Sequence, residues 1–175
     1  VKITQKADQE LKVYYTRKSY TLSYQTNGGS YIEPQTGLYE EKLPITSDIP
    51  TKEGYTFAGW YTNKELTGSP VTGSIELTGD QTLYAKWEPK IVPYTVVYFK
   101  EVYDNSTGTF SYVYQTSARK SGTVGTTVQA SNADSIASSL PYHQTDTEKN
   151  ADSSVVIKPD GSSVLNVYYK LKRYT

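Results

Sequence analysis

The chain has 175 residues, with 18 basic and 18 acidic side chains and no cysteine. This length allows one or two domains, and the balanced charge gives no net field to attract nucleic acid or an anionic membrane. The absence of cysteine excludes disulfides and thiolate metal sites. No apolar run approaches the ~20 residues of a membrane-spanning helix, so we expect no direct membrane insertion.

Tyrosine dominates the aromatic content, with 18 Tyr against 3 Phe and 2 Trp. A tyrosine combines a large apolar ring with a hydroxyl that tolerates water, so it suits strands that are half buried. The composition therefore favours thin β-sheets whose faces are partly wet.

An internal repeat links the two ends of the chain. Residues 1–21 and 155–175 align without a gap at an offset of 154, and nine positions are identical. These positions are Val1, Ile3, Leu11, Val13, Tyr14, Tyr15, Lys18, Tyr20 and Thr21. The period is longer than the 20–50 residues of a solenoid repeat, so it indicates tandem folded units. We expect residues 1–18 to be a terminal strand or hairpin of a preceding unit, packed on the first domain or paired with an exposed edge of another molecule. Residues 173–175 would start the next unit.

Alternation of apolar and polar residues predicts β-strands along most of the chain. The clearest runs are residues 20–25, 82–87, 110–115 and 165–170. Residues 94–99 are apolar on nearly both faces, which predicts a central strand. A turn signal at 159–161 predicts a hairpin that joins residues 155–157 to the strand at Leu165.

One segment has a helical pattern, and another has the composition of a linker. Ser131 is a candidate N-cap for a short helix that runs to Leu140, where Pro141 would end it. Two prolines in residues 89–93 indicate a short, restrained linker. The predicted organisation is a domain at 19–88, this linker, and a second domain at 94–172.

Three motifs of the first predicted domain carry a family resemblance. They are Thr26-Asn27-Gly28-Gly29, the run from Glu53 to Tyr61, and the run from Thr78 to Trp87. In this order and spacing they resemble the Listeria–Bacteroides repeat, over residues 20–87. The resemblance implies a β-grasp-like fold in secreted or wall-attached bacterial proteins. It marks as structural motif residues Gly28, Gly29, Tyr55, Phe57, Trp60, Leu83 and Trp87.

The second predicted domain, residues 94–172, resembles the mucin-binding-protein (MucBP) type of repeat. The resemblance rests on the strand at 94–101, the segment 120–125 and the closing strand at 164–170. This family is also implied to be a β-grasp relative. The predicted fold is therefore mainly β (α+β at most), with two tandem small β-grasp-like domains, each a mixed or antiparallel sheet with little helix.

Five tyrosines are candidate ligand contacts, because several of them lie opposite the apolar face of their strands. They are Tyr14, Tyr61, Tyr84, Tyr112 and Tyr168. The alternative for these side chains is cross-strand pairing on a wet sheet, which we favour. Trp60 and Trp87 could form a sugar platform, but their place in the family motif favours core packing.

The sequence offers no catalytic or metal-binding constellation. His143 is the single histidine and no nucleophile motif accompanies it, so we expect an isolated surface side chain. The loosely spaced Asp146, Glu148 and Asp152 predict a solvated loop. With no cysteine and one histidine, a structural zinc site is excluded in practice, and no calcium-binding loop is present. We predict no enzyme activity, no cofactor and no metal.

These observations favour a non-catalytic repeat module that acts as a stalk or spacer in an extracellular bacterial adhesin at the cell surface or cell wall. Its expected partners are neighbouring repeat units of the same chain. The alternative is a binding module that recognises a glycan or a host protein through exposed tyrosines in a multivalent array. A hydrolase would need two close carboxylates in a cleft, which the sequence does not indicate.

Overall fold

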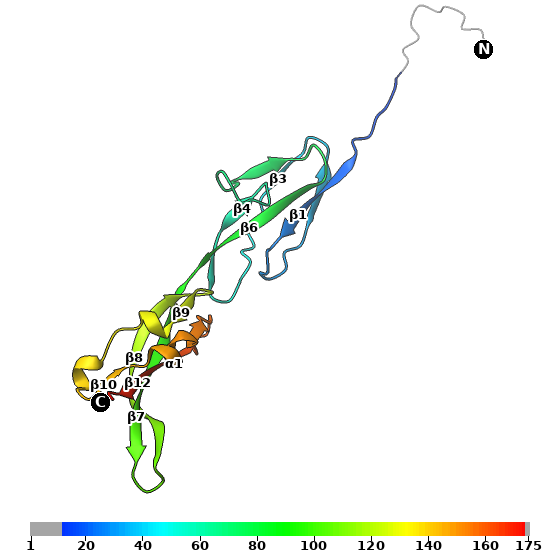
Figure 1. Cartoon of the computed structure of the whole chain (residues 1–175). Coiled ribbons are helices and arrows are strands. Elements are labelled where there is room, and N and C mark those ends of the chain that lie inside the picture. The colour runs from blue at the N-terminus through cyan, green and yellow to red at the C-terminus, as the bar shows by residue number, and fades with distance from the viewer. Residues whose placement is uncertain (1–11, 174–175) are drawn as a thin grey trace, which may run out of the picture.

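The computed structural model describes residues 12–173, which form two sheet-rich halves arranged end to end (Figure 1). Within these residues lie twelve strands, two 3-10 turns and one short α-helix. We call residues 19–89 the first half and residues 91–171 the second half. The prediction of a mainly β fold with two small sheets and little helix is confirmed.

The first half consists of six strands. They are β1 (Ser19–Gln25), β2 (Gln35–Leu38), β3 (Lys42–Pro44), β4 (Tyr55–Tyr61), β5 (Ser74–Glu76) and β6 (Gln81–Pro89). Four of them form a mixed sheet in the order β2-β1-β6-β4, in which β1 and β6 are parallel and the outer pairs are antiparallel. The short strands β3 and β5 pair with each other as a separate antiparallel ribbon.

The second half also has six strands, with short helical turns between them. The strands are β7 (Ile91–Asp104), β8 (Thr109–Thr123), β9 (Thr127–Gln129), β10 (His143–Thr145), β11 (Ser154–Val156) and β12 (Val164–Leu171). The turns are η1 (Ala130–Asn132), η2 (Ala137–Ser139) and the α-helix α1 (Thr147–Ala151). The main sheet has the order β10-β12-β7-β8, with β7 and β12 parallel, so β7 is the predicted central strand.

The two halves share one topology. In each, the first strand pairs antiparallel with the second and parallel with the sixth, and the sixth pairs antiparallel with the fourth. The third strand pairs with the fifth in both. Each strand of one half therefore has a counterpart in the other, and the strands of the main sheets correspond as β1 and β7, β2 and β8, β4 and β10, and β6 and β12.

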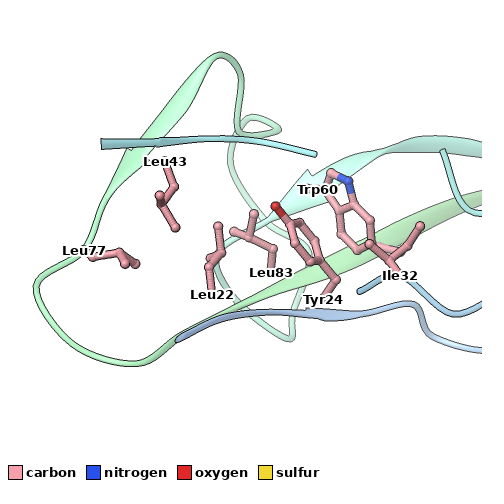
Figure 2. Close-up of a cluster of buried hydrophobic side chains, with 8 residues drawn as sticks. Leu22, Tyr24, Ile32, Leu43, Trp60, Leu77 and Leu83 are labelled. Carbon is pink, nitrogen blue, oxygen red and sulfur yellow. The ribbon is translucent and has the colours of Figure 1, made fainter. Parts of the chain in front are cut away.

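Each half has its own hydrophobic core. In the first half, Leu22, Leu77 and Leu83 are fully buried, and the Tyr24 and Trp60 rings meet edge to face at 4.9 Å (Figure 2). Successive residues of a strand point to opposite faces, so the alternation seen in β1 places Leu22 and Tyr24 together in this core. The core of the second half combines residues of β7 and β12 with the two 3-10 turns. Its buried members are Val96, Tyr98, Ala130, Leu140, Leu165, Val167 and Tyr169.

Two local predictions are wrong. The helix expected from Ser131 to Leu140 is replaced by the two 3-10 turns, which place Leu140 in the core. This stretch is rich in Ser, Asn and Asp, whose side chains compete with helical backbone bonds. The predicted hairpin at 159–161 does not form either: β11 pairs with β9, and β12 pairs with β7 and β10. There the Ser163 hydroxyl accepts the Lys158 N–H at 2.8 Å, so the turn is closed by a side chain and no ladder forms.

The predicted terminal strand or hairpin at residues 1–18 lies outside the described residues as far as residue 11. Residues 12–18 have no regular secondary structure and are exposed.

Candidate functional site

The glycine-rich loop of the first half holds the Trp87 side chain. Trp87 Nε1 donates to the Thr26 carbonyl at 2.8 Å, and the side-chain nitrogen Nδ2 of Asn27 donates to the Ala85 carbonyl at 2.8 Å. A Cβ atom at Gly29 would overlap the Trp87 ring, and Gly28 has φ +86°. The two glycines are therefore required by a close approach and by a left-handed turn.

The aromatic motif residues form one packed group. The Phe57 ring lies 5.2 Å from the Trp60 ring and 5.5 Å from the Trp87 ring, in edge-to-face contacts. Leu83 is fully buried beneath this group. Both indoles therefore pack in and around the core of the first half, which removes most of their faces from solvent.

The joint between the halves is short and hydrogen-bonded on both sides. Of the predicted linker at 89–93, Lys90 alone lies outside a strand, because β6 ends at Pro89 and β7 begins at Ile91. The Lys90 N–H donates to the Gly54 carbonyl at 2.8 Å, and the Lys90 carbonyl accepts from Val124 N–H at 2.9 Å. One residue thus forms a backbone hydrogen bond with each of the two halves.

Side chains close the same joint. Gly54 has φ +76°, and a Cβ atom there would lie 2.5 Å from Pro159 Cβ and 3.1 Å from a methyl group of Val124. A Cβ atom at Gly125 would lie 3.4 Å from the hydroxyl of Tyr55. The motif residue Tyr55 therefore lies at the boundary with the second half, where the two halves are packed at van der Waals distance.

The second sheet carries a cluster of three aromatic rings beneath a lysine. The Phe99 and Tyr168 rings stack at 5.2 Å with an interplanar angle of 19°, and the Tyr112 ring meets Tyr168 edge to face at 5.1 Å. Lys149 Nζ lies 5.0 Å from the Tyr112 centroid and 4.7 Å from the Tyr168 centroid. We call these four residues the aromatic face; it is half buried and carries a cation–π pair.

A buried carboxylate supports this face. Asp146 accepts a short hydrogen bond from the Tyr112 hydroxyl and another from Lys149 N–H at 3.1 Å, and Lys170 Nζ lies 3.8 Å away. Burial by itself would raise the pKa of Asp146, but these three partners hold it below its ordinary value. Burial and then the bond to Asp146 raise the pKa of Tyr112, so its hydroxyl remains a donor.

The five candidate contact tyrosines are divided between different surfaces. Tyr112 and Tyr168 meet in the aromatic face, whereas Tyr14 is 86% exposed in residues 12–18. Tyr61 and Tyr84 are cross-strand partners on β4 and β6, but Tyr61 is only 5% exposed, so the expectation that it faces solvent is wrong. β4 is an edge strand that lies under the loop from 62 to 73, where Val71 N–H bonds to the Trp60 carbonyl. Tyr84 lines a shallow hollow of about 310 Å³.

The polar residues near His143 are also placed differently from the prediction. His143 is half buried, and its Nε2 lies 2.8 Å from the Glu101 carbonyl. Asp146, expected in a solvated loop, caps α1 and is only 7% exposed, and Glu101 is 8% exposed. The sequence does contain the signal for the cap, since Asp146 precedes the helix-forming run Thr-Glu-Lys-Asn-Ala.

Within residues 12–173, no group of three or more His, Asp or Glu side chains is arranged to hold a metal ion. In that same part of the chain, no helix combines the length and apolar character needed to cross a bilayer.

The chain thus consists of two small β halves in series, and comparison with known sequences finds a family model that matches residues of the first half. Residues 20–86 match the family model of the Listeria-Bacteroides repeat domain, which confirms that part of the predicted resemblance. A relative from Evansella cellulosilytica, named as a Gly-rich membrane protein, is 38% identical over 88 residues, covering 49% of this chain and 10% of the relative. A second relative from the same organism, named as a membrane protein, is 40% identical over 78 residues, covering 44% of this chain and 11% of the relative. The chain thus spans about a tenth of the length of these relatives.

Proposed function

We propose that this chain is a non-catalytic repeat module of a bacterial cell-surface protein, where it acts as a spacer in the stalk of an adhesin. Its partners are neighbouring repeat units of the same polypeptide, and its location is extracellular. The match of residues 20–86 to a repeat domain supports this function. The 154-residue internal repeat supports it further, because it indicates tandem units. We also propose that the second half is a MucBP-like repeat.

The joint at Lys90 is the observation that carries the spacer function. A spacer must hold its ends apart, so its joints must resist bending. A one-residue break between two strands, with both the N–H and the carbonyl of Lys90 bonded, leaves few backbone torsions free. The packing of Gly54 against Pro159 restricts the remaining motion.

Residual dipolar couplings measured by NMR on the full chain test this function at the level of the joint. If the two halves form one rigid body, a single alignment tensor fits the couplings of both. Small-angle X-ray scattering on proteins of one, two and three units provides the second arm, in which the maximum dimension should grow by equal steps. Independent tensors for the two halves, or a maximum dimension that grows as a flexible chain does, would refute the spacer.

The aromatic face favours a second candidate function, in which the module binds a glycan or a host protein. Stacked rings with a nearby lysine can contact the apolar face of a sugar. Mucin and a glycan array would be tested for binding with one-unit and three-unit proteins, and with a Tyr168→Ala variant of each. A matched control is Tyr114→Ala, because Tyr114 is exposed on β8 and belongs to no ring pair of the face. Binding that is stronger with three units and lost in Tyr168→Ala alone would establish this function, and no binding would eliminate it.

A further inference from the structure

The bonds of the Lys90 joint occur again at both ends of the described chain, one bond at each end. At Lys90, the N–H donor bonds to the residue just before β4, and the carbonyl acceptor bonds to the residue just after β8. The counterparts of these positions in the shared topology are the residue before β10, Tyr142, and the residue after β2, Tyr39. The Lys172 N–H donates to the Tyr142 carbonyl at 2.9 Å, and the Lys18 carbonyl accepts from Tyr39 N–H at 2.8 Å.

Lys18 and Lys172 occupy the same position of the 154-residue repeat. Lys172 has the backward bond of a joint and Lys18 has the forward bond. A residue that combined both would reproduce the bonding of Lys90. The two ends of this chain therefore carry complementary parts of one joint.

The residues around Lys18 fit this interpretation. Val13 and Tyr15 are 60% and 89% exposed, whereas their repeat counterparts Val167 and Tyr169 are each 2% exposed in the core of the second half. Residues 12–17 thus have the sequence of a β12 strand but do not lie in a sheet that would bury them. Behind Lys18, a groove of about 300 Å³ is lined by Thr16, Arg17, Lys18, Tyr20 and Tyr39.

We propose that the C-terminal end of the second half is a docking surface for the first half of a following copy of this repeat unit, with Lys172 as the joint residue. This inference rests on the proposed spacer function and extends it from the joint within a unit to the joint between units. The surface consists of residues 171–173 together with residues 103–110 at the projecting end of the β7–β8 hairpin, which we call the hairpin tip.

The hairpin tip reaches the place where the following half would begin. Pairing of β12 with β7 ends at Tyr169 and Lys100, but pairing of β7 with β8 continues to Asp104. Figure 1 shows this hairpin extending past the rest of its sheet. Because β7 and β12 are parallel, continuing their register places Asp104 level with Arg173, the repeat counterpart of Ser19 at the start of β1.

The hairpin tip presents an aromatic pair that has the chemistry for such a contact. The Tyr103 and Phe110 rings lie 4.8 Å apart and are 48% and 50% exposed. Arg173 lies 4.2 Å above the Phe110 ring and forms an ion pair with Glu101 at 2.9 Å. The same Glu101 carboxylate accepts Leu171 N–H at 2.9 Å, so it fixes the direction in which the chain leaves the second half.

A chain that continues in this direction would place the following half alongside the hairpin tip. In the following copy, the counterparts of Tyr20 and Tyr39 would then lie next to Tyr103 and Phe110. In this chain, the rings of Tyr20 and Tyr39 are 6.3 Å apart and both line the groove next to Lys18. Aromatic contact of this kind adds to the area buried at the joint and favours one fixed angle.

A two-unit protein tests the docking directly. It consists of residues 1–175 followed by a second copy of residues 22–175, which keeps the 154-residue period. Because the chain has no cysteine, spin labels can be attached at introduced cysteines alone. One labelled pair, Gln144 and Lys42 of the second copy, spans the joint between units. A second pair, Thr56 and Thr127, spans the Lys90 joint at the corresponding strands.

Distance distributions from pulsed electron paramagnetic resonance supply the readout, and a Gly-Gly-Ser insertion after Lys172 provides the reference for a flexible joint. We expect a narrow distribution across Lys172 in the parent protein. The double variant Tyr103→Ala/Phe110→Ala in the first unit should broaden this distribution toward the reference. Tyr114→Ala, on the same strand as Phe110, should not broaden it. Circular dichroism confirms that the variants are folded.

Three results would overturn the docking surface. The distance distribution across Lys172 could be as broad in the parent protein as in the reference, it could stay narrow in the double variant, or Tyr114→Ala could broaden it as much as the double variant does. The pair across Lys90 separates this failure from failure of the proposed function. If the distribution across Lys172 is broad while that across Lys90 is narrow, the docking is refuted and the spacer within one unit stands. If both are broad, the spacer is refuted as well.

Discussion

Replacing Gly54 by alanine should strain the joint between the halves. The φ of +76° costs a non-glycine residue about 1–2 kcal/mol, and the new Cβ atom would meet Pro159 Cβ at 2.5 Å. Overpacking of this kind typically costs about 1–3 kcal/mol. Gly68→Ala is the matched control, because Gly68 has φ +83° and no atom lies within 4 Å of its added Cβ. We therefore expect Gly54→Ala to lower the free energy of unfolding by about 2–5 kcal/mol and Gly68→Ala by about 1–2 kcal/mol.

Urea unfolding followed by tryptophan fluorescence is the appropriate assay, since Trp60 and Trp87 both lie in the first half and report on the half that contains Gly54. Residual dipolar couplings provide a second readout, because the halves can relieve the clash by rotating apart. Adding Pro159→Gly should narrow the difference between Gly54→Ala and its control, because it removes the contact at 2.5 Å but leaves the Val124 methyl group at 3.1 Å. If Gly54→Ala costs no more than Gly68→Ala and leaves the orientation of the halves unchanged, the packing argument for a rigid joint is wrong.

Three further outcomes are expected. Leu83→Ala should cost about 2–5 kcal/mol of stability in the same fluorescence assay, because Leu83 is fully buried, and a loss below about 1 kcal/mol would contradict its place in the core. Tyr112→Phe removes a hydrogen bond to a buried carboxylate and should cost about 1.5–3 kcal/mol in thermal unfolding, whereas an unchanged melting temperature would argue against that bond. The folded-state pKa of Asp146 is lowered, so its carboxylate stabilises the fold above the ordinary pKa of 3.8, and this stability is lost as the pH falls through the lower folded value. In an acid titration, Asp146→Asn should therefore lose less stability below about pH 4 than the parent, and equal slopes would refute the assignment.

The local patterns that predict strands succeeded where burial alternates along a single element. Leu22 and Tyr24 are buried in β1 and Val167 and Tyr169 in β12, as period-2 alternation requires. Patterns that depend on a distant partner failed. The segment from Ser131 contains apolar residues at helical spacing, but Leu140 reaches the core through two 3-10 turns because the sheet presents its surface there.

The site residues divide in the same way. The sequence marked Tyr112 and Tyr168 as candidates, but the two residues are 56 positions apart, and Tyr112 is 34 positions from Asp146. Only the pairing of β7 with both β8 and β12 brings the two rings to a centroid distance of 5.1 Å. Lys149 and Asp146 come from a helix whose cap is visible in the sequence, yet their contacts with the rings depend on where α1 lies against β12. The Asn150 side chain decides that position by bonding to both the N–H and the carbonyl of Tyr168, at 2.8 and 3.0 Å.

The sequence by itself determined the β class, the glycine and tryptophan motif of the first half, and the 154-residue repeat, because each of these depends on residue type and spacing along one chain. The tertiary structure alone decided that both halves share one topology and that Lys90, Lys18 and Lys172 take part in equivalent backbone bonds. Backbone N–H and carbonyl groups are present at every position except proline nitrogen, so the sequence carries no mark of which of them will pair. The arrangement of the strands in the folded chain determines which of these groups form hydrogen bonds with one another, and it therefore determines the geometry of the joint.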